Sequence, residues 1–275
     1  MKLQTIVDIK PSEWKIGYED KILMLGSCFS DEIGEQMQQR YLQVTCNPFG
    51  TLYNPLSIAN AINYKLQITN YELPLVEYDG LWHSMAHHGA FSRPTKEEAE
   101  TAVRESIETM QKALAEATVV IVTFGTAWVY EMGGQIVGNC HKLPADAFTR
   151  RRLTVEEIVA TWQPIIDRYP DKHWLFTVSP IRHIKDGLHE NQLSKATLLM
   201  AVEALTGASY FPSYEILLDE LRDYRFYADD LVHPSSLAVK YIWERFVDTF
   251  CTPQTKNELM LQHKRWKAAN HRPLH

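Results

Sequence analysis

Short apolar runs alternate along the chain with longer segments in which apolar residues recur every three or four positions. The runs at 21–25, 42–46, 119–124, 174–178 and about 209–211 predict strands. The run at 119–124 consists of β-branched and apolar residues, which is typical of a strand buried on both faces. Helical spacing follows, over about 30–40, 57–66, 95–117, 155–169, 193–205, 216–221 and 236–250. This alternation predicts an α/β fold in which a parallel sheet lies between two layers of helices.

The chain shows no internal repeat, low-complexity stretch or clear linker, so we expect a single domain over 1–275. Its core spans about 20–250, and 251–275 form a C-terminal tail with a helix from about 256. Residues 70–95 and 130–152 are rich in turn residues and are expected to be loop insertions. A further strand is expected at 3–8.

Composition narrows the classes of function. With 275 residues, 45% hydrophobic and 23% charged, the chain is an ordinary globular protein. Its formal net charge of −6 argues against nucleic acid as the main partner, because phosphate binding favours a basic face. No segment approaches the ~20 apolar residues that span a bilayer, and residues 1–20 lack the apolar core of a signal peptide. We therefore expect a cytoplasmic protein without a membrane span.

Cysteine and histidine spacing gives no sign of a metal site. Cys28, Cys46, Cys140 and Cys251 show no C-x-x-C pattern, which argues against structural zinc and fits reduced thiols. The histidines within 83–92 have no carboxylate neighbours and are weak support for a metal. No metal and no organic cofactor is expected, and the sequence does not indicate an oligomeric state.

The most informative stretch is Lys21-Ile-Leu-Met-Leu-Gly-Ser-Cys-Phe-Ser30, where a short apolar run breaks at Gly26. Ser27 follows at once, before a segment with helical spacing, so the stretch predicts a buried strand, a sharp turn and a helix start. Ligands of open α/β sheets bind at the carboxyl ends of strands, where helix N-termini also favour negative charge. Ser27 is thus a candidate nucleophile. Alternatively, Gly26 only makes the turn, and Ser27 or Ser30 only caps the helix.

Polar residues also follow the other predicted strands. The loop 47–55 holds two Asn, Gly125-Thr-Ala-Trp128 ends the third strand, and Ser179-Pro-Ile-Arg-His183 ends the fourth. We expect these segments and the His-rich stretch 83–92 to line a pocket at one edge of the sheet. The candidates for substrate binding are Asn47, Asn54, His87, His88, Trp128, His141, Arg182 and His183. Arg182 and His183 can instead satisfy loop carbonyls, and the histidines of 83–92 can be surface residues.

A late Asp and His complete a possible catalytic set. Asp230-Leu-Val-His233 lies just before the last long helix of the core. An Asp three residues before a His can hold the imidazole Nδ1–H and leave Nε2 to take the proton of Ser27. Ser, His and Asp act together by geometry rather than chain order. Alternatively, Asp230 or His233 only caps the helix that begins after Pro234.

Several motifs together resemble the GSCFA family, named for a Gly-Ser-Cys-Phe-Ala motif that reads Gly26-Ser-Cys-Phe-Ser30 here. The further matches, in order, are Asn-Pro-Phe-Gly and Tyr-Asn-Pro within 47–55, Gly-Thr-Ala-Trp at 125–128, Asn-Cys-His-Lys at 139–142, Ser-Pro-Ile-Arg-His at 179–183 and Asp-Asp-Leu-Val-His-Pro at 229–234. The resemblance covers the chain to about residue 250. That family is similar to the SGNH/GDSL esterases and acyltransferases, which implies a flavodoxin-like, three-layer αβα fold.

The resemblance also implies roles for single residues. By motif, Ser27 matches the nucleophile of those enzymes, and Asp230 and His233 match the late pair. The backbone N–H groups of Ser27 and Gly50 match two donors to the oxyanion. The implied function is a serine esterase that hydrolyses a small acyl ester, such as an acetyl ester of a carbohydrate or metabolite. The alternatives are an acyltransferase with the same site and a non-catalytic ligand-binding domain on the same fold.

The chain departs from the SGNH pattern in its third motif. The Asn donor to the oxyanion is missing there, because Gly125 is followed by Thr126 and an Ala. Asn139, Thr126 and His141, in that order of preference, are candidates to replace it. Cys28 stands directly beside the candidate nucleophile, and we interpret it as a small buried residue rather than a thiol nucleophile.

Overall fold

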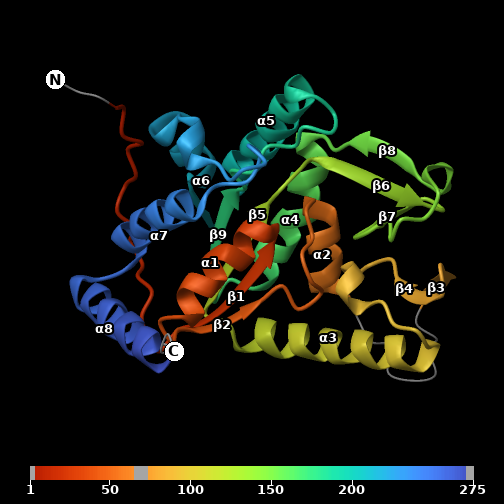
Figure 1. Ribbon diagram of the computed structural model, residues 1–275, viewed down its shortest axis with the longest axis horizontal. Helices are drawn as coiled ribbons and strands as arrows, with labels where there is room; N and C mark the ends of the chain where they lie inside the picture. The colour runs from red at the N-terminus through yellow and green to blue at the C-terminus, as the bar shows by residue number, and fades with distance from the viewer. Residues whose placement is uncertain (1–3, 65–73, 271–275) are drawn as a thin grey trace, which may run out of the picture.

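The main sheet of the protein is parallel and has the strand order of flavodoxin-like folds. The computed structural model describes residues 4–64 and 74–270, and within these ranges five strands pair in the order β10–β9–β5–β1–β2 (Figure 1). They are β1 (Lys21–Gly26), β2 (Gln43–Cys46), β5 (Val119–Phe124), β9 (His173–Val178) and β10 (Ala208–Phe211). Counted along the chain, the order is 2-1-3-4-5, which is the flavodoxin-like order. The predicted fold class is confirmed.

Helices cover both faces of this sheet (Figure 1). One apolar core lies under α2 (Pro55–Asn63), α3 (Lys96–Glu116), α4 (Val155–Arg168) and α5 (Leu188–Ala204). The other lies under α1 (Cys28–Gln38), α7 (Ser236–Phe250) and α8 (Pro253–Ala269). Successive strand residues point to opposite faces, so Leu23 and Leu25 enter the first core while Ile22 and Met24 enter the second.

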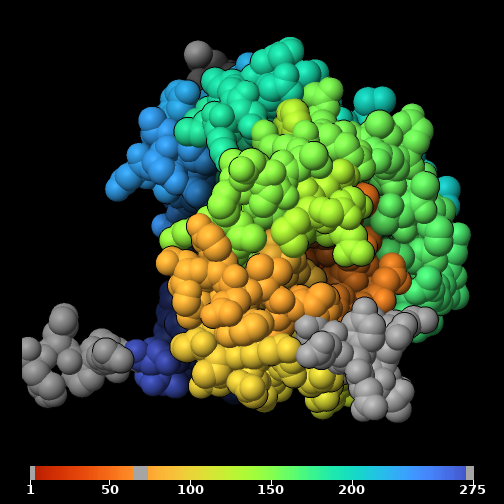
Figure 2. Space-filling view, turned by 90° about the vertical axis from the view of Figure 1, so that its right-hand side faces the viewer, coloured from red at the N-terminus to blue at the C-terminus, as the bar shows by residue number. Residues whose placement is uncertain are grey.

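Both predicted loop insertions contain short antiparallel strands, which the sequence pattern did not predict. β3 (Leu75–Tyr78) pairs with β4 (Leu81–Ser84), and β6 (Trp128–Met132) pairs with β7 (Gln135–Val137) and β8 (Thr149–Arg152). Figure 2 shows this face, with the yellow-green β6–β8 region above the orange β3–β4 hairpin. Strands of three to five residues that carry several charges, as β8 does, lack the apolar alternation by which longer strands are recognised.

Other departures from the sequence-based predictions are small. The helix expected at 216–221 is a π-helix, Ile216–Leu221, which continues the single turn α6 (Ser213–Glu215). Residues 4–8 form no strand, and residue 3 lies outside the described residues. The helix expected to reach residue 66 ends with α2, and residues 65 and 66 are likewise not described. Short 3₁₀ turns occur at Gly89–Phe91, Ala145–Ala147 and Tyr224–Phe226. None of the helices in the described ranges is both long and apolar enough to cross a membrane.

The carboxyl ends of the central strands lie at one edge of the sheet. Gly26 of β1 pairs with Thr123 of β5, and Thr123 pairs with Thr177 of β9. The residues that follow these three strands therefore start from neighbouring positions. This is the edge at which ligands bind in open α/β sheets.

Candidate active site

Ser27 occupies the sharp turn between β1 and α1. Gly26 has a φ of +131°, and a Cβ at this position would lie 2.1 Å from the carbonyl oxygen of Thr123, so only glycine fits. Ser27 is the N-cap residue of α1, but its side chain makes no capping hydrogen bond. Ser27 is 1% exposed, and its Oγ has no hydrogen-bond partner among the described residues. The interpretation of Ser27 as a helix cap is therefore wrong, and its hydroxyl is free for another role.

Asn47 fixes this turn from the neighbouring loop. Its Oδ1 accepts the N–H of Gly26 at 2.8 Å, and its Nδ2 donates to Asp31 Oδ1 at 2.7 Å. Thr51 Oγ1 donates to the other oxygen of Asp31 at 3.0 Å. Asn47 was predicted to bind substrate, but both ends of its amide hold protein groups and it does not line the pocket that Ser27 lines. It acts on the site by positioning the strand end.

Asp230 and His233 form a hydrogen-bonded pair in the turn before α7. Asp230 Oδ2 lies 2.6 Å from His233 Nδ1, and Oδ1 accepts the N–H groups of Val232 and His233 at 2.9 Å each. These backbone donors, followed by the imidazole, lower the pKa of the Asp230 carboxyl to about 2. Because Nδ1 donates to a carboxylate, Nε2 of a neutral His233 is left as an acceptor.

Arg182 holds this turn from the loop after β9. Its backbone N–H donates to the carbonyl of Val232 at 3.3 Å, and its Nη2 donates to the carbonyl of Leu231, a residue with a φ of +58°. The guanidinium lies 4.5 Å from the ring centroid of Tyr227 and 5.3 Å from that of Tyr224. Arg182 thus contacts loop carbonyls, as one of its two interpretations predicts, and it also lines the pocket that Ser27 lines.

Ser27 and His233 both line a pocket of about 510 Å³. Asp230 lies behind His233 and does not line it, as expected of a group that orients the imidazole. The other predicted site residues that line this pocket are Asn54, Thr126, Trp128, Asn139, Arg182 and His183. Those that do not line it are Asn47, Gly50, His87, His88 and His141.

The backbone donors predicted for the oxyanion are engaged elsewhere. The N–H of Gly50 donates to the carbonyl of Asn47 at 2.7 Å, and the N–H of Ser27 donates to that of Thr123 at 3.2 Å. Gly50 has a φ of +74°, and a Cβ on it would lie 2.3 Å from the Cβ of His88. In this conformation Gly50 serves a turn and a close packing contact, and its N–H is not free to receive an oxyanion.

Two of the three side chains considered as a replacement for the missing Asn do line the pocket. Asn139 Oδ1 accepts the N–H of His141 at 2.8 Å, and no acceptor for its Nδ2 is found in the described part of the chain. Thr126 Oγ1 accepts the N–H of Trp128 at 3.1 Å and lies 3.2 Å from Ser194 Oγ. His141 is 8% exposed, and its Nε2 is bonded to the carbonyl of Ser84 at 2.9 Å, so it is a buried structural residue.

His87 and His88 were predicted to bind substrate, but neither lines the pocket that Ser27 lines. His87 is fully buried, stacks on Phe49 with ring centroids 4.0 Å apart, and bonds Ser84 and Ser106 through its two nitrogens. Burial lowers its pKa to about 3, so it is neutral. His88 caps the short turn Gly89–Phe91 by accepting the N–H of Ala90. Both histidines stabilise the inserted segment rather than the pocket.

Lys195 was missed by the sequence analysis. It lies within α5, is fully buried, and its Nζ donates to the carbonyls of Gly125 at 2.7 Å and Ser179 at 2.6 Å. His183 Nε2 is bonded to the same Gly125 carbonyl at 2.9 Å. Burial lowers the pKa of Lys195 to about 7, and burial with the nearby Lys195 charge lowers that of His183 to about 4. A lysine in mid-helix gives no sequence signal of this role.

Cys28 lines the pocket beside Ser27 as a thiol. Burial, and then the charge of Asp31, raise its pKa to about 11. A thiol with so high a pKa is a poor nucleophile near neutral pH. Within residues 4–64 and 74–270, no three His, Cys, Asp or Glu side chains are grouped so that they could hold a metal ion.

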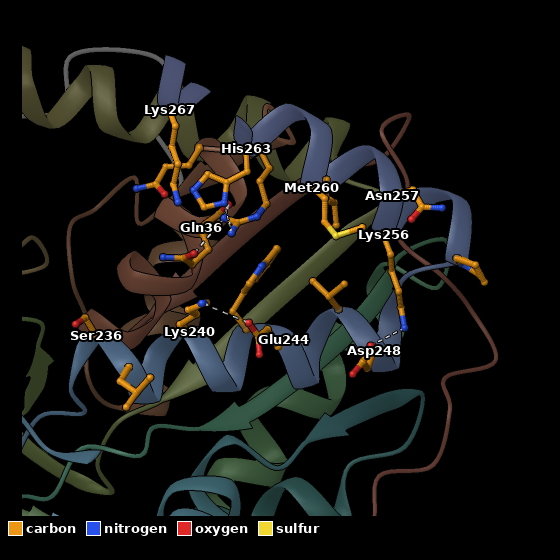
Figure 3. A pocket seen from close by; sticks show the side chains of 17 residues that line it. Gln36, Ser236, Lys240, Glu244, Asp248, Lys256, Asn257, Met260, His263 and Lys267 are labelled. Carbon is orange, nitrogen blue, oxygen red and sulfur yellow. Dashed lines mark hydrogen bonds and ion pairs between the residues drawn. The ribbon is translucent and has the colours of Figure 1, made fainter. Parts of the chain in front are cut away.

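A larger groove of about 1040 Å³ lies elsewhere, between the carboxyl-terminal half of α1 and the helices α7 and α8 (Figure 3). None of the predicted site residues lines it. Its charged side chains partly neutralise one another, as in the pairs Lys256–Asp248 at 2.6 Å and Lys240–Glu244 at 3.9 Å. The smaller pocket at the strand ends is thus the better candidate for a site.

Comparisons with known proteins identify a family. A model of the GSCFA family matches residues 21–246. The crystal structure of a carbohydrate esterase family 3 protein from Talaromyces cellulolyticus is similar over 90% of this chain and 99% of that one, with 9% identity and a TM-score of 0.37. No curated protein sequence matches significantly. Any activity must therefore be argued from the pocket itself.

Proposed function

This chain belongs to the GSCFA family, and we propose that it is a serine esterase that hydrolyses a small acyl ester, such as an acetyl ester of a carbohydrate or metabolite. The observation that carries the proposal is the bonded Asp230–His233 pair, whose imidazole lines the same pocket as the free hydroxyl of Ser27. These are the parts of a nucleophile, base and orienting group. No metal or organic cofactor takes part in the proposed reaction.

In the proposed reaction, Ser27 Oγ attacks the ester carbonyl while His233 Nε2 takes the hydroxyl proton. The tetrahedral intermediate collapses to an acyl-serine, and His233 returns the proton to the departing alcohol. Water then attacks the acyl-serine with His233 again as base, which releases the acid and restores Ser27. Asp230 keeps Nδ1 protonated throughout, so Nε2 is the nitrogen that exchanges the proton.

Two groups in the pocket can stabilise the oxyanion. Asn139 has a side-chain N–H without an acceptor in the described residues, and it lines the pocket that Ser27 lines. Ser27 also lies at the N-terminus of α1, where the first-turn N–H groups favour negative charge. A donor of this kind contributes about 3–4 kcal/mol to the transition state where one has been removed. Asn139 is our first choice as the replacement for the missing Asn.

Two observations favour a different function, a non-catalytic ligand-binding domain. The two backbone N–H groups expected to bind the oxyanion, those of Ser27 and Gly50, donate to protein carbonyls instead. Ser27 Oγ also has no hydrogen bond to His233 in this conformation. Catalytic hydrogen bonds often form only when substrate is bound, which is why we prefer the esterase.

Labelling by a fluorophosphonate separates these functions, because the reagent needs an activated serine. We expect the wild-type protein to be labelled, Ser27→Ala to lose labelling completely, and the matched variant Cys28→Ala to keep most of it. Labelling that depends on Cys28 would make the protein a thiol enzyme. Absence of labelling in a folded wild-type protein would favour the binding domain. If acceptor alcohols divert the acyl group from water, the protein is an acyltransferase.

A further inference from the structure

The pocket that contains Ser27 and His233 is positively charged, although the chain as a whole has a formal net charge of −6. The side chains of Arg150, Arg182 and Lys185 line it, and Asp186 is the one acidic residue among its lining residues in the described chain. Both oxygens of Asp186 are bonded to Arg150, at 2.5 and 2.6 Å. Arg182 and Lys185 have no carboxylate within 4 Å in the described residues, so two positive charges remain uncompensated.

Two of the lining side chains also carry N–H groups without acceptors. Trp128 Nε1 and Arg182 Nε are buried, and neither has a hydrogen-bond partner in the described part of the protein. A buried donor left without an acceptor is costly, so such groups are commonly completed by a ligand or water. The donors are on different elements, β6 and the loop after β9, and both border the same space. That space therefore favours a ligand rich in acceptor oxygens.

We propose that the substrate is an anionic ester, one that carries a carboxylate or phosphate group which Arg182, Lys185 and the indole N–H of Trp128 receive. This inference rests on the proposed esterase function. A positively charged pocket in a protein of negative net charge raises the local concentration of an anionic substrate at its entrance. Charge alone does not distinguish one anion from another, so selection among anions depends on the shape of the pocket. Lys185 is the exposed member of the set, and its Nζ is held 3.2 Å from the hydroxyl of Tyr130.

Matched esters test the proposal directly. The acetate esters of 4-hydroxybenzoate, of 4-hydroxybenzamide and of 4-hydroxyphenyl phosphate differ mainly in charge, and each kcat/KM is divided by the rate of hydrolysis by hydroxide. We expect the corrected kcat/KM of one or both anionic esters to exceed that of the neutral amide by about tenfold at low salt, with the excess falling as salt screens the charges. The anionic ester with the higher corrected kcat/KM, carboxylate or phosphate, identifies the anionic group that the pocket prefers. Equal corrected values for all three esters would overturn the proposal.

Two variants assign the preference to the pocket. Lys185→Gln should lower the anionic-to-neutral ratio about threefold, because one partly screened charge is removed. Trp128→Phe keeps an aromatic ring but removes the indole N–H, and it should lower the same ratio by removing one donor. Lys112→Gln makes the same charge change on an exposed part of α3 and should leave the ratio as it is. A ratio that falls equally in Lys112→Gln and Lys185→Gln would contradict the assignment.

Binding separates failure of this inference from failure of the esterase function. Calorimetry with 4-hydroxybenzoate, 4-hydroxyphenyl phosphate and 4-hydroxybenzamide needs no turnover. If no ester is hydrolysed but an anion still binds more tightly than the amide, and Lys185→Gln weakens that binding, the anion site stands and the esterase proposal falls. If the esters are hydrolysed but the three phenols bind equally, the esterase stands and the anion site falls.

Discussion

Asp230 offers the sharpest test at the scale of a single residue. Asp230→Asn keeps the size of the side chain but can present an N–H to the imidazole, which favours the wrong tautomer of His233. We expect kcat/KM for an activated acetate ester to fall about 10⁴-fold while the fold is retained, as measured by circular dichroism and urea unfolding. Because the pKa of Asp230 is lowered to about 2, its ionisation should leave no step in the wild-type pH–rate profile near neutrality. Full activity of Asp230→Asn would exclude this pair from the chemistry.

The buried Lys195 predicts the direction in which the free energy of unfolding changes with pH. Its pKa is about 7 in the folded protein and 10.5 as an ordinary lysine, so between these values the unfolded chain holds a proton that the folded chain has lost. The free energy of unfolding of the wild type should therefore rise with pH from about 7 to about 10 relative to Lys195→Met, by up to about 1.4 kcal/mol per pH unit. Urea unfolding of both proteins across this range measures the difference. A difference independent of pH would show that Lys195 keeps its charge when buried.

The residue roles that could be predicted from the sequence are those that depend on near neighbours along the chain. The turn at Ser27 and the Asp230–His233 hydrogen bond both follow from a few consecutive residues. The packing of Gly50 against His88 and the stacking of His87 on Phe49 were not predicted, because each pair joins segments that the sequence pattern does not bring together. A histidine that completes a core and one that binds a ligand are alike in sequence.

At the scale of elements, the passage from β1 to α1 depends on close approach to β5. Gly26→Ala should destabilise the protein by more than about 3 kcal/mol, since it adds a clash with the backbone of Thr123 to the strain of a positive φ. Gly134→Ala is the matched control, because Gly134 has a φ of +79° and no heavy atom within 4 Å of an added Cβ. Its cost should stay near the ~1–2 kcal/mol of positive φ alone. Equal losses in urea unfolding would show that close approach at Gly26 is unimportant.

Helices and strands with a strong apolar pattern could be predicted from the sequence. Elements that depend on pairing with other strands could not. The five strands of the main sheet are short apolar runs, and each was expected close to where it lies. The strands β6, β7 and β8 instead depend on their pairing with one another and on side-chain contacts, such as that of the Arg150 guanidinium 4.4 Å from the ring centroid of Trp128. Single-sequence patterns carry no information on such pairing. The strands β6–β8 that line the pocket were therefore not predicted, although the strand ends of the main sheet that also border it were.

At the scale of the molecule, a buried ion pair joins three distant segments. Glu220 has a fully buried side chain and bonds Arg245 Nη1 through both oxygens at 2.6 Å, while Val7 donates its N–H to Glu220 at 2.9 Å and accepts from Arg245 at 2.6 Å. Glu220→Ala should cost about 3 kcal/mol in urea unfolding, because it leaves a partly buried guanidinium without its carboxylate. The double variant Glu220→Leu, Arg245→Met should recover most of that loss. Additive losses would mean that the pair is not coupled.

Ser27 follows the first strand of the main sheet and His233 precedes the helix α7, so about 200 residues separate the two groups. During synthesis, at ~5–20 residues per second, Ser27 emerges early but has no base until after the last strand of the main sheet, β10, has been made. For the proposed hydrolase, the growing chain is thus inert towards esters. Closing so long a loop also comes late in folding, because contacts distant in sequence form slowly. Return of fluorophosphonate labelling after dilution from urea should consequently lag behind recovery of helical signal, and simultaneous recovery would contradict this order.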